Sequence, residues 1–191
     1  MKKIILASAS PRRKELLEKI GLKFEVEPAG YEEIVDTGME AHELVRRLSR
    51  DKAEVVARKY RNAVVIAADT VVLIDGKILG KPHNRTEAKK MLRALSGRSH
   101  VVITGFTIID TAKRRTLSRA VETKVYIREL NTEEIDAYVK SGEPFDKAGA
   151  YGIQGLGSVI VEKIEGDYYN VVGLPLSALT VALKEFGVNI L

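Results

Sequence analysis

The chain has 191 residues, of which 45% are hydrophobic and 30% charged, and its formal net charge is +5. This composition is typical of a globular protein, and the length suffices for one large core or two small lobes. The absence of cysteine excludes disulfides and thiolate metal sites. No apolar run approaches a membrane span and no cleavable signal pattern is found, so we expect a cytoplasmic protein. The positive charge favours an acidic partner, either a phosphorylated small molecule or nucleic acid.

The first part of the chain predicts an anion-binding site between a strand and a helix. Residues 4–6 are typical of a buried strand, and a helical spacing of apolar residues follows up to residue 20. Ser10 is a good N-cap and Pro11 suits the first helical position. The first turn of this helix favours a phosphate, beside the polar residues Ser8, Ser10, Arg12 and Arg13. The alternative is a capped surface helix with a solvated basic face.

A short strand at residues 24–26, a loop at 31–39 and a long amphipathic helix at 41–59 are predicted next. The loop carries Glu32 and Glu33, and exposed loop acids by themselves indicate little. The helix carries Lys52, which would ordinarily be placed on the surface.

Asp69 and Thr70 interrupt the most hydrophobic segment, residues 63–74, which otherwise is typical of a central strand covered on both faces. A carboxylate inside such a strand costs several kcal/mol unless it is paired, bound to a metal or opened to a cleft. We interpret Asp69 as part of a working site, because perturbed buried acids cluster at such sites. The alternative is that Asp69 caps a bend and pairs with a lysine.

The remaining elements alternate between strands and helices. Asp75-Gly76 predicts a tight turn into a strand at 77–79, after which Lys81 lies on a loop. The later predictions are a helix from Thr86 to residue 95, a hairpin of strands 99–109 and 117–127, a helix capped by Thr132, a strand at 158–164, a turn at 166–170 and a helix at 175–186. This order predicts an α/β fold with a mixed sheet, in one domain of residues 1–191.

Two further stretches carry unusual composition. The cluster Lys113-Arg114-Arg115 at the hairpin tip is interpreted as a solvated turn, with a nucleic-acid contact as the alternative. Three glycines within residues 145–155 indicate a backbone that turns sharply or closely approaches another group.

Several of these segments together resemble one family, in order and across nearly the whole chain. The matching motifs are Ser8-x-Ser10-Pro11-Arg12-Arg13, Glu33, Lys52, Ala68-Asp69-Thr70, Gly80-Lys81-Pro82, the run from Asp146 to Gly155, and Gly173-Leu174-Pro175. They resemble the Maf family of nucleoside triphosphate pyrophosphatases, once labelled septum formation inhibitors. The resemblance implies a fold like that of inosine triphosphate pyrophosphatases, an elongated mixed β-sheet with flanking helices and two lobes around a cleft. It also implies a divalent cation, Mg²⁺ or Mn²⁺, and a homodimer.

The resemblance implies hydrolysis of a nucleoside triphosphate to the monophosphate and pyrophosphate, in a nucleotide house-cleaning role. Asp69 would be the general base, and Glu33 and Asp69 would hold the metal. The residues expected to bind the substrate phosphates are Ser8, Ser10, Arg12, Arg13, Lys52 and Lys81. Arginine suits this role because its fork matches phosphate oxygens, whereas lysine acts as a point charge.

Three positions distinguish subgroups of the family, and here they are Arg12, Thr70 and Gln154. This set resembles the subgroup that acts on dTTP and UTP, whereas relatives that hydrolyse 7-methyl-GTP carry Trp, Gln and Glu. An amide such as that of Gln154 can both donate to and accept from uracil or thymine. Thr70 and Gln154 would both reach the base only if the strand bulges at Thr70. Asn84 departs from the family pattern, in which an acid is common at this position, and it precedes a helix rather than lying in one of the matching motifs.

Two other functions remain open on the sequence. One is a pyrophosphatase for unusual purine triphosphates, such as those of inosine and xanthosine. The other is a nucleic-acid-binding module, which is disfavoured because only 6% of the residues are aromatic and tryptophan is absent.

Overall fold

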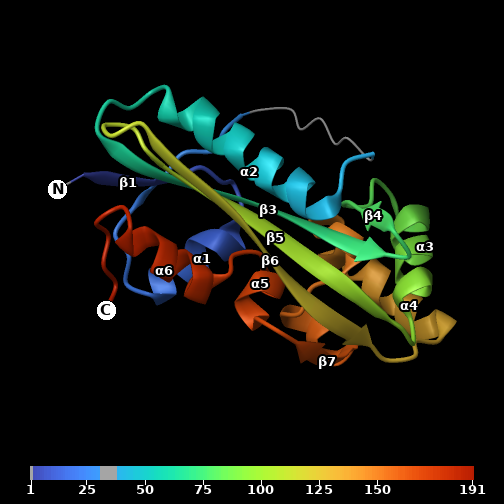
Figure 1. Cartoon of the computed structure of the whole chain (residues 1–191). Coiled ribbons are helices and arrows are strands. Elements are labelled where there is room, and N and C mark those ends of the chain that lie inside the picture. The colour runs from blue at the N-terminus through green and yellow to red at the C-terminus, as the bar shows by residue number, and fades with distance from the viewer. Residues whose placement is uncertain (1, 31–37) are drawn as a thin grey trace. The chain divides into compact units, whose positions relative to one another are not determined.

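The computed structural model describes residues 2–30 and 38–191 (Figure 1). Its strands are β1 (Lys3–Leu6), β2 (Glu25–Val26), β3 (Ala63–Ile74), β4 (Lys77–Leu79), β5 (Ser99–Asp110), β6 (Arg115–Ile127) and β7 (Val161–Glu165). Its α-helices are α1 (Pro11–Lys19), α2 (Ala41–Ala57), α3 (Arg85–Leu95), α4 (Thr132–Lys140), α5 (Tyr168–Val172) and α6 (Leu176–Lys184). Short 3₁₀ helices are η1 (Glu143–Asp146), η2 (Ala148–Ala150) and η3 (Gly155–Val159). Within these ranges no helix is long and apolar enough to cross a membrane.

The strands form one mixed sheet, as predicted. Its order is β2-β1-β3-β5-β6-β7, with β4 beside β3, and the long strands β3, β5 and β6 lie next to one another (Figure 1). β1 pairs in parallel with both β2 and β3, so that Leu6 lies opposite Ile66. β4 pairs antiparallel with β3, and β7 pairs antiparallel with β6. The prediction of an α/β fold built on a mixed sheet is therefore confirmed.

The chain forms two compact units. Unit 1 comprises Met1–Asp69, Thr104–Val121 and Gly173–Leu191, and unit 2 comprises Thr70–Ile103 and Glu122–Val172. Because β3, β5 and β6 each continue from one unit into the other, both units are discontinuous in sequence.

In unit 1, helix α2 packs against the sheet. Its buried Ala53 and Val56 share a core with apolar side chains of β1 and β3, including Ile5 and Val65. The helix starts at Glu40, whose carboxylate accepts hydrogen bonds from the N–H groups of residues 42 and 43 at 3.0 and 3.1 Å. This capping fixes where α2 begins and hence which of its residues face β3.

Gly105 on β5 marks a close approach between α2 and the sheet. A Cβ atom at this position would lie 2.3 Å from the carbonyl oxygen of Val45 and 2.8 Å from the backbone nitrogen of Arg46. Both neighbours are helix backbone, which cannot move aside without displacing α2.

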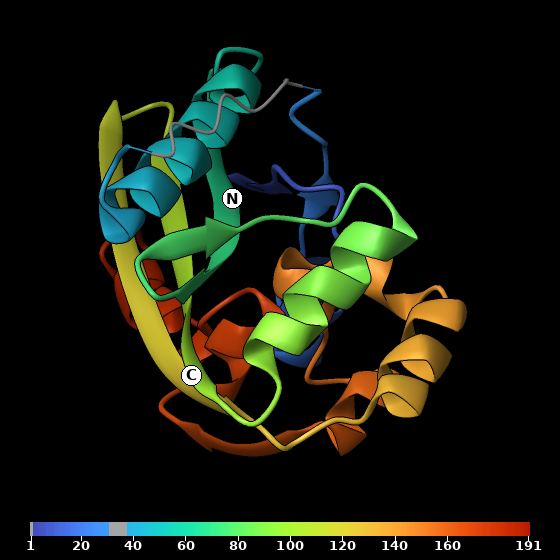
Figure 2. The same ribbon diagram turned by 90° about the vertical axis from the view of Figure 1, so that its right-hand side faces the viewer.

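In unit 2, helices α3 and α4 lie side by side (Figure 2). Leu92 of α3 and Ile135 of α4 share a core with Val102 of β5 and Val125 of β6. Asn84 caps α3, because its side-chain oxygen accepts a hydrogen bond from the N–H of Glu87 at 2.9 Å. The residue that departs from the family pattern is therefore the N-cap of this helix.

Three local predictions are wrong in unit 2. Helix α4 is capped by Asn131 rather than Thr132, because Asn131 and Glu134 exchange side-chain-to-backbone bonds at 2.9 and 3.0 Å. Residues 166–170 are not simply a turn, since helix α5 begins at Tyr168. The strand predicted at 158–164 begins only at Val161, because η3 occupies the preceding residues.

His100 on β5 is buried in unit 2 with only 3% of its surface exposed. Its Nε2 lies 2.6 Å from the hydroxyl of Tyr151, and within the described ranges its Nδ1 has no hydrogen-bond partner. Burial lowers the pKa of His100 from 6.5 to about 4. The imidazole of His100 in the folded protein therefore stays neutral down to a pH of about 4.

We predict that Gly105→Ala lowers the free energy of unfolding by about 2–3 kcal/mol, because the methyl group overlaps helix backbone. Denaturant unfolding measures this loss. Gly80→Ala is the matched control, because a Cβ there meets nothing within 4 Å. Equal stability of the two variants would show that α2 does not approach β5 so closely.

We also predict a pH dependence of stability from His100. The unfolded chain protonates this side chain near pH 6.5 and the folded chain only near pH 4, so stability is complete above 6.5 and falls between 6.5 and 4. The loss is roughly 3 kcal/mol. Denaturant unfolding from pH 7 to 4 should show a shallower fall for His100→Gln than for wild type, and parallel curves would contradict this origin.

Candidate active site

Arg13 is held in a defined orientation within unit 1. Its Nε donates to the carbonyl oxygen of Gly173 at 2.9 Å, and its Nη1 donates to Oγ of Ser8 at 3.3 Å. The same Ser8 hydroxyl accepts from the N–H of Ser10 at 3.2 Å. Two sequence motifs, the one around Arg13 and Gly173-Leu174-Pro175, therefore meet at this guanidinium. Ser8 is buried, and its hydroxyl accepts hydrogen bonds both from Arg13 and from the backbone of the loop before α1.

Gly173 supplies its acceptor from a backbone conformation that favours glycine. Its φ is +122°, which other residues rarely adopt. A side chain at this position would strain the backbone that presents the carbonyl oxygen to Arg13.

Ser10 and Pro11 occupy the predicted positions at the start of α1. Ser10 is the N-cap residue and Pro11 the first helical residue, but the Ser10 side chain makes no capping hydrogen bond. The predicted helix start and N-cap position are thus correct, although the Ser10 side chain does not cap the helix. Arg12 follows in the first turn and is half-buried.

Asp69 pairs with Lys52 inside unit 1. Nζ of Lys52 on α2 donates to Oδ2 of Asp69 on β3, and the two side chains are only 14% and 10% exposed. The alternative that Asp69 pairs with a lysine is therefore correct in part. Asp69 caps no bend, however, because β3 is continuous from Ala63 to Ile74. Buried ion pairs of this kind are weak evidence for stability and often mark sites of function.

The other predicted site residues within the described ranges lie in unit 2. Thr70 is half-buried on β3, whereas Lys81 and Gln154 are exposed on connecting segments. The N–H of Gly149 donates to the carbonyl oxygen of Gly80 at 3.0 Å, which joins the Gly80-Lys81-Pro82 motif to the glycine-rich run. The structure thus brings these two motifs together.

Asp69 is the only predicted metal ligand in the described part of the chain, because Glu33 lies outside it. Among the described residues no group of three or more His, Asp or Glu side chains could hold a metal ion. Mg²⁺ is commonly bound by one or two carboxylates together with substrate phosphates and water. A single carboxylate beside the Lys52 ammonium fits that mode of binding, and the divalent cation remains a prediction.

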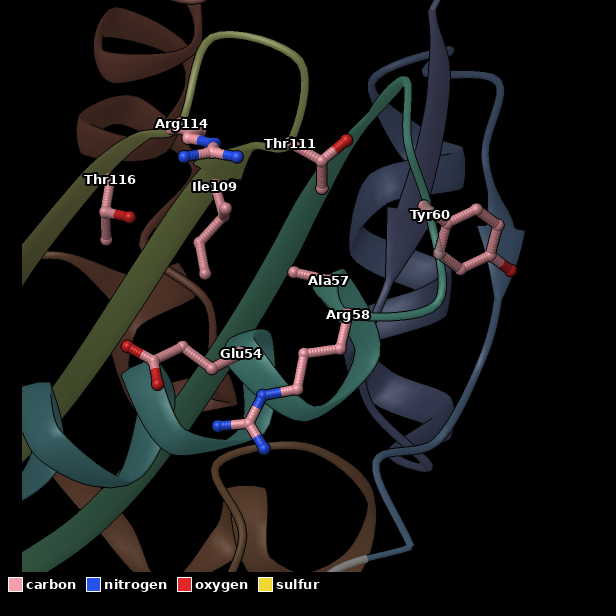
Figure 3. Close-up of a pocket in the computed structure, with 8 residues that line it drawn as sticks. All are labelled: Glu54, Ala57, Arg58, Tyr60, Ile109, Thr111, Arg114 and Thr116. Carbon is pink, nitrogen blue, oxygen red and sulfur yellow. The ribbon is translucent and has the colours of Figure 1, made fainter.

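A separate pocket of about 530 Å³ lies in unit 1 beyond the end of α2 (Figure 3). Glu54 of α2 and Arg58, the residue after the end of α2, line one side of this pocket, and Ile109 and Arg114 line it from the β5–β6 hairpin. None of the predicted site residues lines this pocket.

The basic cluster at the hairpin tip is only partly a solvated turn. Arg115 pairs with Glu185, donates to its carbonyl oxygen at 2.7 Å and lies over the ring of Phe186. One of the three cations is therefore already engaged, which weakens the nucleic-acid alternative.

Two residues that were not predicted, Tyr138 and Glu143, contact the segment that carries Gln154. The carboxylate of Glu143 accepts hydrogen bonds from backbone N–H groups at residues 156 and 157, just after Gln154. Tyr138 lies in the apolar pattern of α4 and Glu143 before a proline, so no local signal identified either residue.

Comparison with known proteins agrees with this fold and these motifs. The solved structure of the Staphylococcus aureus Ham1 protein matches 97% of the chain and 100% of its own length, with a TM-score of 0.56 and 13% identity. That likeness places the chain in the same class of α/β folds. The family model for Maf-like proteins matches residues 3–186, and the chain belongs to this family.

Three similar proteins share one name. Proteins named dTTP/UTP pyrophosphatase from Methanococcoides burtonii, Bacillus anthracis and Caldicellulosiruptor saccharolyticus are 51%, 50% and 48% identical to this chain. Each alignment covers 100% of this chain and 98% of the relative.

Proposed function

We propose that this protein is a nucleoside triphosphate pyrophosphatase that hydrolyses dTTP and UTP to the monophosphate and pyrophosphate. The observation that carries the proposal is that relatives about half identical over their full length are named for this activity. The buried Lys52–Asp69 pair and the fixed Arg13 are the groups such a reaction needs. The likeness to Ham1 supports the fold alone, so it does not favour a purine substrate.

The proposed phosphate-binding residues are Ser8, Ser10, Arg12, Arg13, Lys52 and Lys81. A nucleoside triphosphate carries roughly four negative charges, which must be neutralised before a carboxylate can act near it. Because Ser8 and Gly173 already orient Arg13, little side-chain freedom remains to be lost when it binds an anion.

The ion pair suggests how Asp69 becomes available. When a phosphate oxygen takes over the Lys52 ammonium, the Asp69 carboxylate is released to accept a proton from water. The water oxygen then bonds to the α-phosphorus, and the bond from that phosphorus to the bridging oxygen breaks. The β,γ-diphosphate leaves as pyrophosphate, and its new charge is stabilised by the cations.

A divalent cation is also proposed, held by Asp69 and Glu33 together with substrate phosphates. When bound, it supplies positive charge at the phosphate oxygens and lowers the pKa of a bound water. The proposal further includes a cytoplasmic location and a homodimer, and light scattering of the purified protein tests the latter.

Base selection is proposed to depend on Arg12, Thr70 and Gln154. The amide of Gln154 makes no hydrogen bond within the described residues, and its side chain is exposed, so its donor and acceptor remain available to a base. An amide matches the alternating acceptors and donor of uracil and thymine.

Asp69→Asn is expected to lower kcat for dTTP by about a hundredfold or more, because the amide cannot take the proton. The measurement is pyrophosphate release from dTTP, UTP, ITP, XTP, GTP and 7-methyl-GTP, with and without Mg²⁺. Near wild-type turnover by the variant would remove Asp69 from the reaction. If the wild-type protein prefers ITP or XTP, its substrates are unusual purine nucleoside triphosphates rather than dTTP and UTP.

Gln154→Glu is expected to reduce selectivity for pyrimidines. A carboxylate would face a base carbonyl and leave it unpaired, at a cost of roughly 2–4 kcal/mol. The ratio of kcat/KM for dTTP to that for GTP measures this effect in wild type and variant. An unchanged ratio would mean that Gln154 does not contact the base.

A further inference from the structure

Glu143 closes one side of the loop that carries Gln154. Its Oε2 accepts from the N–H of Leu156 at 2.9 Å, and its Oε1 accepts from the N–H of Gly157 at 2.9 Å. These residues are 13 and 14 positions away in the sequence. A carboxylate that accepts two adjacent backbone N–H groups orients that backbone strongly, because the bonds are charge-assisted.

Tyr138 closes the other side of the same loop. Its hydroxyl accepts from the N–H of Gly152 at 3.1 Å and donates to Oε1 of Glu143 at 2.9 Å. Both ends of residues 152–157 are therefore fastened to two side chains that bond to each other. We call this arrangement of Tyr138 and Glu143 the loop clamp.

The glycines of this segment allow the loop clamp to close. A Cβ at Gly157 would lie 2.0 Å from the carbonyl oxygen of Gly152, and a Cβ at Gly155 would lie 2.6 Å from Oε2 of Glu143. Gly155 also has φ of +66°, in the left-handed region. Larger residues at these positions would push the backbone away from the carboxylate. The clamp thus explains why glycines recur around Gln154.

The charge state of Glu143 favours the clamp. Burial raises the pKa of Glu143, but the two backbone N–H groups and the Tyr138 hydroxyl outweigh that effect and leave the pKa below its ordinary value. The backbone of η1 is itself fixed, because Nζ of Lys147 donates to the Glu143 carbonyl oxygen at 2.7 Å. The ionised carboxylate is therefore held on a fixed support.

We propose that Glu143 and Tyr138 are positioning residues that set base selectivity by fixing the loop on which Gln154 stands. Gln154 lies between the two fastened ends, and its own amide makes no hydrogen bond within the described part of the chain. The loop clamp holds the backbone and leaves this amide to the ligand. The inference rests on the proposed function and adds residues outside the set that resembles the family subgroup.

The test compares Glu143→Gln and Tyr138→Phe with wild type. The amide of Glu143→Gln places an N–H donor against the N–H of Leu156, and Tyr138→Phe removes the acceptor of Gly152. In each variant we expect the ratio of kcat/KM for dTTP to kcat/KM for GTP to fall about tenfold, mostly because KM for dTTP rises. Turnover of GTP should stay within about twofold of wild type. Glu133→Gln is the matched control, since Glu133 is exposed on α4 and leaves the clamp intact.

Measuring the selectivity of Glu143→Gln and Tyr138→Phe in a Gln154→Ala background tests whether the loop clamp acts through Gln154. We expect Glu143→Gln to cause almost no further loss of selectivity there, because the positioned amide is already gone. A further tenfold loss would overturn the inference. An equal fall in kcat/KM for dTTP and GTP would also overturn it, since that result indicates only a weakened fold.

Amide hydrogen exchange gives a readout that does not depend on turnover. The N–H groups of Gly152, Leu156 and Gly157 should be protected in wild type and should exchange faster in Glu143→Gln. Unchanged protection would overturn the clamp itself. A wild type that prefers a purine would overturn the proposed substrate, while a Gln154-dependent change of that preference in the clamp variants would still support the inference.

Discussion

A carboxylate in the middle of an apolar strand is the constraint on which unit 1 depends. Asp69 is nearly buried on β3, and an isolated charge there would cost several kcal/mol. The cost is offset by Lys52, which reaches it from α2, 17 residues earlier in the chain. The pairing requires α2 to dock on β3 in one register, and the neighbouring Ala53 enters the core in that same register. Packing and charge therefore specify one arrangement together.

The docking of α2 also depends on small and polar side chains. Gly105 lets the helix backbone approach β5, and the hydroxyl of Ser49 lies 2.8 Å from that of Thr107, which in turn lies 2.8 Å from that of Ser118. Buried hydroxyls that bond to one another avoid the cost of unpaired polar groups. Unit 1 thus combines an apolar core with a few polar contacts that are specific in distance and partner.

Both units position their polar residues by the same physical means. In unit 1 the acceptors of Ser8 and Gly173 orient Arg13, and in unit 2 the carboxylate of Glu143 orients a loop of backbone N–H groups. In each case hydrogen bonds between one charged group and neutral donors or acceptors fix the orientation of the group. Such preorganisation matters for catalysis and selectivity, because displacements of about 1 Å can cost a hundredfold in rate.

The sequence by itself determined the elements whose signals are local. The continuous hydrophobic run of residues 63–74 predicted β3 with its true bounds, and Asp75-Gly76 predicted a turn that has φ of +49° and +72°. The ordered motifs also predicted the family, which the family model over residues 3–186 confirms. These predictions succeeded because hydrophobic period, turn residues and motif order are properties of neighbouring positions.

Only the tertiary structure decided which group each polar side chain meets. It paired Asp69 with Lys52, placed Arg13 on the carbonyl oxygen of Gly173, 160 residues away, and gave Glu143 a role that the sequence did not indicate. It also converted the start of the strand predicted at 158–164 into η3. The physical reason is the same for all four. Hydrogen bonds and ion pairs depend on distance in space, and packing brings together residues whose separation along the chain carries no signal.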